Sequence, residues 1–457
     1  MKKLICFVLL AALTLTLFGC GASQQAEPPV LKVGYAAQNV TPEYEVGLGG
    51  YSDAHTRVHT SVLDPVYVIC VAATYGEDTV LTYVMDMSCA PDSFTRTVVP
   101  MISSATNVPE SNIIITATHT HSSPSLTGGV NIDRYRPELM GHLVTAGQKA
   151  LEDRAPATIS TGVKQIEGLN FVRNYYMSDG KYEDDTMDTV YAAHCTDSDS
   201  RMMLVKFDRE EKQDILLVNW QAHPDHAYQN GYNAMSADYP GALRNYVSEE
   251  TEMLVAFIPG ASGNQNPGSK IASEKHGLKM NQYGKKLGEH AVEALADLKQ
   301  VGSEGITVTS KVVDTEVDHS LDHLATKAAE AYKVFETQGL AAGNAKAKEY
   351  GIKGSYHARA ISQRKGMGPT KPLTIHAWRI GDVGFTSGMY EMFSDASLYI
   401  RENATFETVM ICQGNYSYVA SEYAFDCGTY EAITGYYAKG TSEMLAKEFV
   451  SMLETVK

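Results

Sequence analysis

The sequence predicts an α/β protein in which mixed β-sheets are flanked by α-helices within a single large domain. Two observations support this fold class. Apolar runs rich in β-branched residues alternate along the chain with segments whose apolar residues recur at helical spacing. The predicted helices keep a polar face, which indicates that they cover the outside of the sheets. No linker, internal repeat or low-complexity tract divides the 457 residues, so we expect one domain over 31–457.

The expected elements follow one another in a regular order. Strands are predicted at 62–73, 80–87, 112–118, 203–207, 214–220, 254–258, 373–380 and 383–386. The strands at 203–207 and 214–220 are close enough in sequence to form a hairpin. Helices are predicted at 93–105, 137–151, 277–298, 324–350 and 441–456.

The N-terminus has the pattern of a bacterial lipoprotein signal. Two lysines precede an apolar run from Leu4 to Leu17, which is too short to span a bilayer, and Gly19-Cys20 follows. We therefore expect 1–20 to be a signal peptide with a lipidated Cys20, and 21–30 to be a flexible tether. An ordinary secretory signal with a chance cysteine is the alternative. The lipoprotein interpretation implies an exported, extracytoplasmic protein that is anchored to a membrane through the lipid on Cys20.

The charge of the chain limits its partners. The formal net charge is −16, and it becomes −18 when Lys2 and Lys3 leave with the signal. An acidic domain is a poor partner for nucleic acid or for an anionic membrane surface, so we expect neither. The charge suits a soluble domain that its lipid anchor holds near the membrane.

The cysteines do not form a recognisable framework. Five remain after the N-terminal segment, widely spaced and without a Cys-x-x-Cys motif: Cys70, Cys89, Cys195, Cys412 and Cys427. This pattern predicts neither a disulfide scaffold nor a thiolate zinc site. Two of them, at 70 and 89, lie in apolar runs and are expected to be buried thiols. The sequence leaves open whether the pair at 412 and 427 forms a disulfide.

Two histidines follow the predicted strand at 112–118. His119 and His121 are two residues apart, so an extended backbone directs both side chains to the same side. Imidazole is the commonest metal-ligating side chain and also transfers protons near neutral pH. The pair therefore indicates a candidate metal-hydrolase site, although two polar loop histidines explain the motif equally well.

Two further strand ends carry side chains of the same chemistry. His223 follows the strand at 214–220, and Glu391 follows a glycine loop after the strand at 383–386. Two histidines and a carboxylate with an open position are a catalytic zinc set, and zinc lowers the pKa of a bound water. A capping His223 and a solvated Glu391 are the alternatives. No HExxH motif is present, so these ligands must converge from distant positions.

The motifs around these residues resemble those of the neutral ceramidase family, the neutral/alkaline, non-lysosomal zinc amidases that cleave N-acylsphingosines. The resemblance runs from VGYAAQNVTPEYEVGLGGYS at 33–52 to the last helix, and ATHTHSSPS at 117–125 is its most specific element. Further matches are NWQAHPD at 219–225, MYEMF at 389–393 and NYSYV at 415–419.

The resemblance implies roles for individual residues. It makes His119, His223, Glu391 and Tyr418 the ligands of one Zn²⁺ per chain, and His121 the histidine that handles protons. Tyr430 matches a tyrosine that assists at the carbonyl, and Arg173 matches the arginine of an Asn-x-x-Arg segment. Packing is the alternative role for the two tyrosines, because the chain has 27.

The sequence departs from the family pattern in two places. The loop GASGNQNP at 260–267 has Asn264 and Asn266 where characterised ceramidases have aspartate and serine. Asn266, which takes a catalytic position, can hydrogen-bond an oxyanion but cannot act as an acid or base. The resemblance also stops at the catalytic domain and does not reach the immunoglobulin-like domain that follows it in the family. We therefore expect substrate capture to differ.

Three functions follow from this interpretation. The first is a zinc-dependent hydrolase that cleaves a linear amide of an N-acyl lipid, such as ceramide, to a fatty acid and an amine. The second is a zinc hydrolase for a different amide or ester, such as a peptidoglycan or bile-acid conjugate. The third is a non-catalytic lipoprotein that binds a lipid or glycan on the same scaffold.

Overall fold

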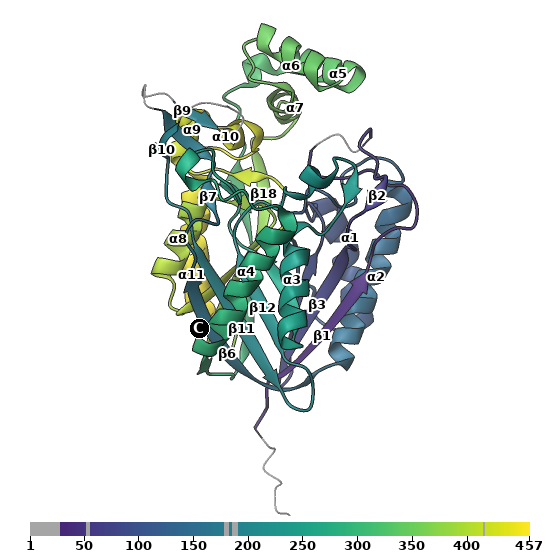
Figure 1. Cartoon of the computed structure of the whole chain (residues 1–457), viewed down its shortest axis with the longest axis vertical. Coiled ribbons are helices and arrows are strands. Elements are labelled where there is room, and N and C mark those ends of the chain that lie inside the picture. Colours follow the sequence, from purple (N-terminus) through teal and green to yellow (C-terminus); the bar gives the residue numbers. More distant parts are fainter. Residues whose placement is uncertain (1–27, 52–54, 178–181, 185–190, 415) are drawn as a thin grey trace, which may run out of the picture.

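In the part of the chain that the structure describes, the main sheet has nine strands and is bent into two halves. The computed structural model describes residues 28–51, 55–177, 182–184, 191–414 and 416–457 (Figure 1). In spatial order the strands are β14 (Leu254–Pro259), β12 (Ile215–Trp220), β11 (Arg201–Arg209), β6 (Ala155–Gln165), β1 (Lys32–Asn39), β3 (Tyr67–Tyr75), β4 (Asp78–Met85) and β5 (Ile113–Ala117), with β16 (Lys299–Val301) also paired to β6. The halves are joined only where β1 meets the first two residues of β6. This corner lets the edge strands β14 and β5 contact each other.

A second sheet of four strands packs inside the bend. Its order is β17 (Ile306–Glu316), β18 (Thr370–Ile380), β19 (Val383–Gly388) and β21 (Thr408–Gln413). The central core lies between the two sheets and contains Ile159 and Phe207 from the large sheet and Trp378 and Phe385 from the small one. The last two rings stack with centroids 5.1 Å apart. Alternate residues of each strand face this core, as the period of two requires.

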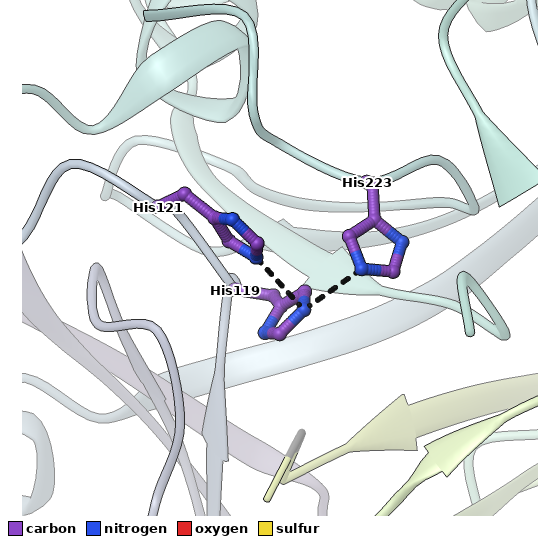
Figure 2. A group of neighbouring side chains, drawn as sticks. All are labelled: His119, His121 and His223. Atoms are coloured by element: carbon purple, nitrogen blue, oxygen red, sulfur yellow. Dashed lines mark hydrogen bonds between the residues drawn. The ribbon is translucent and has the colours of Figure 1, made fainter. Parts of the chain in front are cut away.

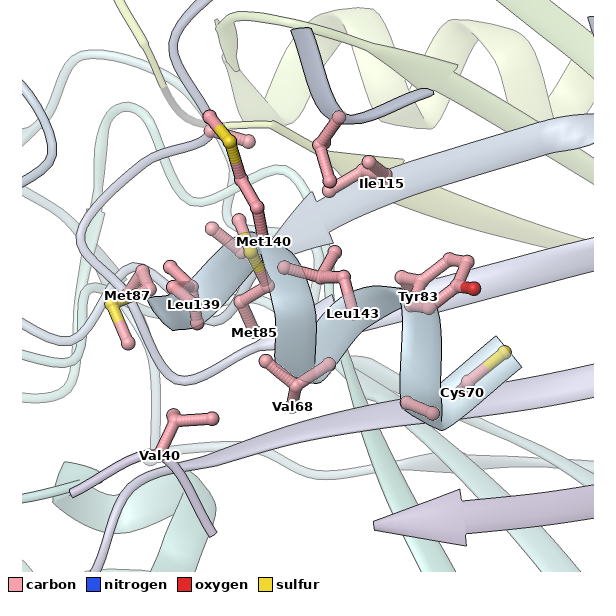
Figure 3. Close-up of a cluster of buried hydrophobic side chains, with 14 of the residues drawn as sticks. Val40, Val68, Cys70, Tyr83, Met85, Met87, Ile115, Leu139, Met140 and Leu143 are labelled. Atoms are coloured by element: carbon pink, nitrogen blue, oxygen red, sulfur yellow. The ribbon is translucent and has the colours of Figure 1, made fainter. Parts of the chain in front are cut away.

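Helices cover the outer faces of both sheets. The half from β1 to β5 is covered by α1 (Asp92–Thr106) and α2 (Ile132–Glu152), and the half from β6 to β14 by α3 (Asp238–Thr251) and α4 (Met280–Ala294). The small sheet is covered by α8 (Ser394–Asn403) and α11 (Thr441–Val456). Figure 3 shows how Leu139 and Leu143 of α2 lie over Cys70, Tyr83 and Met85 of the sheet. The predicted α/β class with helices flanking mixed sheets is confirmed.

A group of three helices stands apart from these layers. It comprises α5 (Ala325–Gln338), α6 (Leu340–Glu349) and α7 (Ser355–Arg364), which lie together at the top of Figure 1, beyond the strand ends. We call α5, α6 and α7 the helical cap. The prediction of one helix over 324–350 is wrong, because Gly339 separates α5 from α6 with a φ of +86°. Such a backbone conformation is favourable for glycine and ends an α-helix.

Most of the other predicted elements are confirmed, with small shifts at their ends. The hairpin is formed by β11 and β12, which pair antiparallel, and α11 has the predicted bounds. The expected burial of Cys70 is confirmed, but Cys89 is only half-buried. All five described cysteines are free, so Cys412 and Cys427 do not form a disulfide.

The N-terminal predictions fall mainly outside the described residues. The signal peptide with Cys20, and 21–27 of the expected tether, belong to this segment. Within the described part of the chain, no helix combines the length and the hydropathy needed to cross a bilayer.

The packing of α2 gives a direct test of the core. Leu143 is fully buried between α2 and the sheet. We expect Leu143→Ala to lower the free energy of unfolding by about 2–5 kcal/mol, because it removes buried apolar surface and leaves a cavity. Met101→Ala on the neighbouring α1 is the control, since Met101 is exposed and such changes stay within about 0.5 kcal/mol. Urea unfolding measures both, and equal losses would contradict this packing.

Candidate metal centre and cavity

His119 lies just beyond β5 in a strained backbone conformation. Its φ is +71°, in the left-handed region that residues other than glycine rarely adopt. The strand ends at Ala117, before either histidine, so His119 and His121 do not share an extended backbone as predicted. Their two rings nevertheless meet. Nδ1 of His119 donates to the Ser88 carbonyl at 2.5 Å. Strain of this kind persists where the surroundings hold a side chain in one place, and it is common at functional sites.

A buried arginine holds the loop that carries His121. Arg57 donates to the carbonyls of Gly49, His121 and Tyr232, at 2.8, 2.7 and 2.7 Å. The backbone of Gly50 passes so close to the ring of His121 that a Cβ there would lie 2.6 Å from Cγ. Nδ1 of His121 is buried and has no hydrogen-bond partner among the described residues. The loop therefore fixes the ring without a hydrogen bond to its Nδ1.

His223 and Glu391 approach His119 from two other directions. His223 follows β12, and its Nδ1 donates to the Ser262 carbonyl at 2.7 Å. Glu391 lies on β20 (Glu391–Met392), which pairs in parallel with β22 (Tyr418–Val419), so that Glu391 is directly beside Tyr418. The sequence positions 119, 223 and 391 thus converge, as the strand-end argument predicts.

The four donor groups have the spacing of ligands around one cation. Figure 2 shows the three imidazoles meeting, with Nε2 of His119 3.1 Å from that of His223 and 3.3 Å from that of His121. Oε2 of Glu391 is 3.3 Å and 3.4 Å from Nε2 of His119 and His223. Ligands at the usual distance from a tetrahedral Zn²⁺ lie about 3.3 Å from one another. The buried His119–His121–His223 group can therefore bind a metal ion.

The hydrogen bonds of the ring nitrogens support the same conclusion. A carbonyl oxygen only accepts, so Nδ1 of both His119 and His223 must carry hydrogen. In a neutral ring Nε2 is then an acceptor. Two such lone pairs and a carboxylate oxygen without a hydrogen-bond partner face the same point, which calls for a cation between them.

Burial and mutual charge shift the pKa values of these groups. Burial lowers the pKa of His119, but the charge of Glu391 and the Ser88 bond outweigh it and raise the pKa overall. Burial and the charge of Arg173 lower the pKa of His223 to about 4. Burial and the neighbouring histidines hold the pKa of His121 well below its usual value. Burial opposes ionisation of Glu391, yet the two histidines hold its pKa far below its usual range. His121 is thus neutral and Glu391 ionised at neutral pH.

Arg173 and Glu431 form a buried pair behind Tyr418. Nε of Arg173 is 2.6 Å from Oε1 of Glu431, and its Nη2 donates to the hydroxyl of Tyr418 at 3.1 Å. Nη1 of Arg173 donates to Oδ1 of Asn266 at 3.4 Å. Burial and the charge of Glu391 raise the pKa of Tyr418 well above its usual value. Arg173 therefore orients a protonated hydroxyl, and Asn266 lies beside Arg173 rather than along the cavity wall.

The centre opens into a cavity of about 570 Å³. Its wall includes His119, His121, Glu391, Tyr418 and Tyr430. Tyr430 begins α10 (Tyr430–Thr434), and its ring centroid is 5.9 Å from that of Tyr418. Burial raises the pKa of Tyr430 too, so both tyrosines are hydroxyl donors. Seven of the eight predicted site residues are in contact with this centre or its two tyrosines, and Asn266 reaches it through Arg173.

Several positioning residues were not predicted. Arg57 and Glu431 carry no recognisable motif, and the carbonyls of Ser88 and Ser262 are backbone groups. For Glu431 the one available signal was its position directly after Tyr430. The contribution of the helical cap to the cavity was also missed.

The fold is that of neutral ceramidase. The structure is similar to the crystal structure of neutral ceramidase from Pseudomonas aeruginosa, with a TM-score of 0.69 and 15% identity over 93% of this chain and 74% of that one. It is also similar to a ceramidase complexed with C2, with a TM-score of 0.67, 15% identity and coverage of 93% and 75%. No protein-family model and no curated protein matches the sequence. At this identity the likeness establishes the neutral ceramidase-like fold, as the sequence motifs predict.

The Arg173–Glu431 pair can be tested by stability. We expect Glu431→Ala to lower the free energy of unfolding by about 3–5 kcal/mol, because it leaves the guanidinium of Arg173 buried without its carboxylate. Asp426→Ala is the matched control. Asp426 pairs with Lys439 on the surface, where both side chains are exposed, and such pairs contribute at most about 1 kcal/mol. Urea unfolding compares the two, and a loss no larger for Glu431→Ala would refute a stabilising role of the buried pair.

Proposed function

We propose that this protein is a zinc-dependent hydrolase that cleaves a linear amide of an N-acyl lipid, such as ceramide, to a fatty acid and an amine. One observation carries the proposal. A buried cluster of three imidazoles and a carboxylate, spaced as zinc ligands are, opens into a cavity within a neutral ceramidase-like fold. His119, His223 and Glu391, with Tyr418 beside them, are the residues that would hold the metal. When bound, Zn²⁺ would polarise the amide carbonyl and lower the pKa of water.

The other residues have the protonation states that amide hydrolysis needs. Neutral His121 can accept a proton from the attacking water and deliver it to the leaving amine. Protonated Tyr418 and Tyr430 can donate to the oxyanion that forms when water adds to the carbonyl. Breaking the C–N bond then gives a carboxylate and a protonated amine, so one water is consumed per amide. Arg173 acts here as a positioning residue for Tyr418.

One observation favours the second candidate, a different amide or ester. The cavity wall is mainly polar and aromatic, with only Ala360 and Met367 as aliphatic members among the described residues that line it. Ligand sites are usually more apolar than this. A substrate with polar groups beyond the amide therefore fits the wall better than two bare alkyl chains do.

The histidine roles can be separated by metal content and turnover. We expect the purified protein to bind about one zinc per chain and to hydrolyse a fluorescent short-chain ceramide. His119→Ala should lose both properties, because it removes a ligand. His121→Ala should keep the metal and lose about 10²–10⁴-fold in turnover, because it removes proton transfer.

His319→Ala, which changes a half-buried histidine that is paired with Asp322 and does not line the cavity, is the control and should retain metal and turnover. Wild-type protein without stoichiometric metal would refute the zinc assignment. Loss of metal in His121→Ala would make His121 a ligand instead. Lipid or glycan binding without any turnover would favour the non-catalytic function.

We also propose that the chain is an exported lipoprotein, held at a membrane by a lipid on Cys20. The support is the signal pattern that ends at Cys20. In a bacterial host, Cys20→Ala should move the protein from the membrane fraction to the soluble fraction, because a lipid anchor supplies the membrane affinity. Immunoblotting of the two fractions measures this, and an unchanged distribution would rule out the anchor.

A further inference from the structure

The helical cap forms one wall of the cavity into which the metal centre opens. It contributes Tyr332 from α5 and Tyr356, Arg359, Ala360 and Gln363 from α7. The four α7 residues follow the spacing i, i+3, i+4 and i+7, which places them on one face of the helix. Arg359 is central in that face. The cap therefore presents one guanidinium to the cavity from the middle of an aromatic and polar stripe.

The cap is held directly against the catalytic tyrosines. α7 contacts α10, and the ring of His357 lies edge-on to that of Tyr430, with centroids 5.4 Å apart. A molecule whose carbonyl lies at Tyr430 therefore has the groups next to its amide close to α7. This arrangement lets Arg359, two residues after His357 on the same helix, contact a group a few bonds from the bond to be cleaved.

Tyrosines surround the guanidinium. Tyr416 and Tyr436 line the same cavity as Tyr332, and the charge of Arg359 acts on all three. Burial raises the pKa of Tyr416 to about 12, which the charge of Arg359 only partly opposes. Burial also raises the pKa values of Tyr332 and Tyr436. These hydroxyls stay protonated at neutral pH and can donate hydrogen bonds.

The charges of the wall are divided between its two ends. Among the described residues that line the cavity, Glu391 is the only carboxylate and Arg359 the only guanidinium. Glu391 is engaged by His119 and His223 at the metal centre. The side of the cavity formed by the cap thus carries a guanidinium and tyrosine hydroxyls, with Glu336 of α5 beside Tyr332 but outside the wall. A guanidinium and hydroxyl donors are the groups that recognise a carboxylate.

We propose that Arg359 binds a carboxylate on the substrate, and that the substrate is an N-acyl amino acid or a closely similar amide with an anionic end. This inference rests on the proposed amide hydrolysis and narrows its substrate. The carbonyl of the amide lies at Tyr418 and Tyr430, and the carboxylate lies between Arg359 and the surrounding tyrosines. Neutral amides of the same length lack the charge-assisted hydrogen bond to the guanidinium and bind more weakly.

The test uses two amides that differ only at the end group. N-octanoylglycine has a carboxylate where N-octanoylethanolamine has a hydroxymethyl group. We expect the zinc-loaded wild-type protein to prefer the glycine amide in kcat/KM by at least about tenfold, as for a hydrogen bond to a charged group. Arg359→Gln should remove most of this preference, and Arg359→Lys should restore part of it, because lysine keeps the charge without the planar fork.

Lys365→Gln is the matched control. It removes one positive charge just beyond α7, from an exposed residue that does not line the cavity, and the preference should persist. A purely structural role of Arg359 would lower the turnover of both amides alike. No preference in the wild type, or a preference that Arg359→Gln keeps, would overturn the proposal.

Failure of the proposed function gives a different result. If the wild type hydrolyses neither these amides nor ceramide, amide hydrolysis is refuted, and calorimetric binding of N-octanoylglycine then tests the carboxylate site alone. Binding that weakens at least about tenfold in Arg359→Gln but not in Lys365→Gln supports the site. Equal binding by all three proteins, or none by the wild type, overturns it.

Discussion

The buried carboxylate of Glu391 is the group on which the arrangement of the centre depends. Removing a carboxylate from water is costly unless opposite charge and hydrogen-bond donors surround it. Here the opposite charge can be a proton on His119, whose pKa Glu391 raises, or a cation between Oε2 and the Nε2 atoms of His119 and His223, which lie 3.3 and 3.4 Å from it. The two histidines follow strands of the large sheet, whereas Glu391 follows the small sheet. Either charge joins the two sheets electrostatically at the point where the strands end. A bound cation would do so for all three groups at once, because its charge would stabilise Glu391 and both Nε2 lone pairs.

A second buried pair, Arg173 and Glu431, holds the tyrosines beside the centre. Arg173 contacts Glu431, Tyr418 and the carbonyl of Gly263, so it connects the loop after β14 with β22 and α10. Asn264 in that loop donates to the hydroxyls of Ser394 and Tyr423 and accepts from the backbone of Ser394. An amide meets all three demands because it both donates and accepts, whereas a carboxylate lacks the donors. The asparagine that departs from the family pattern is thus integrated into the structure around the site.

The sequence predicted most of the parts of the structure in which local pattern and burial agree, although it missed the buried strand β21. The apolar runs of β3, β4, β5, β12 and β14 are buried on both faces, and the His–His–Glu set follows directly from where three strands end. The strands β6 and β17 were not predicted. Their serines, threonines and lysines obscure the alternation of apolar and polar residues, which becomes evident only when one face of the strand is packed. Tyr418 and Tyr430 were found through family resemblance, since neither stands out among 27 tyrosines. Arg57 and Glu431 act through contacts with residues far away in sequence, which no local pattern encodes.

The metal centre and the cap side of the cavity are supported by different parts of the fold. The metal centre is enclosed by sheets and by hydrogen bonds to the backbone carbonyls of Ser88 and Ser262, so its geometry tolerates little change. The helical cap has its own small core of alanines on α5, α6 and α7. Residues on its cavity face, such as Arg359 and Gln363, can change without disturbing that core. In the proposed function, the strand ends would determine the chemistry, and the cavity face of the cap, which has a core of its own, would select the substrate. That separation would allow the same centre to act on amides with different end groups.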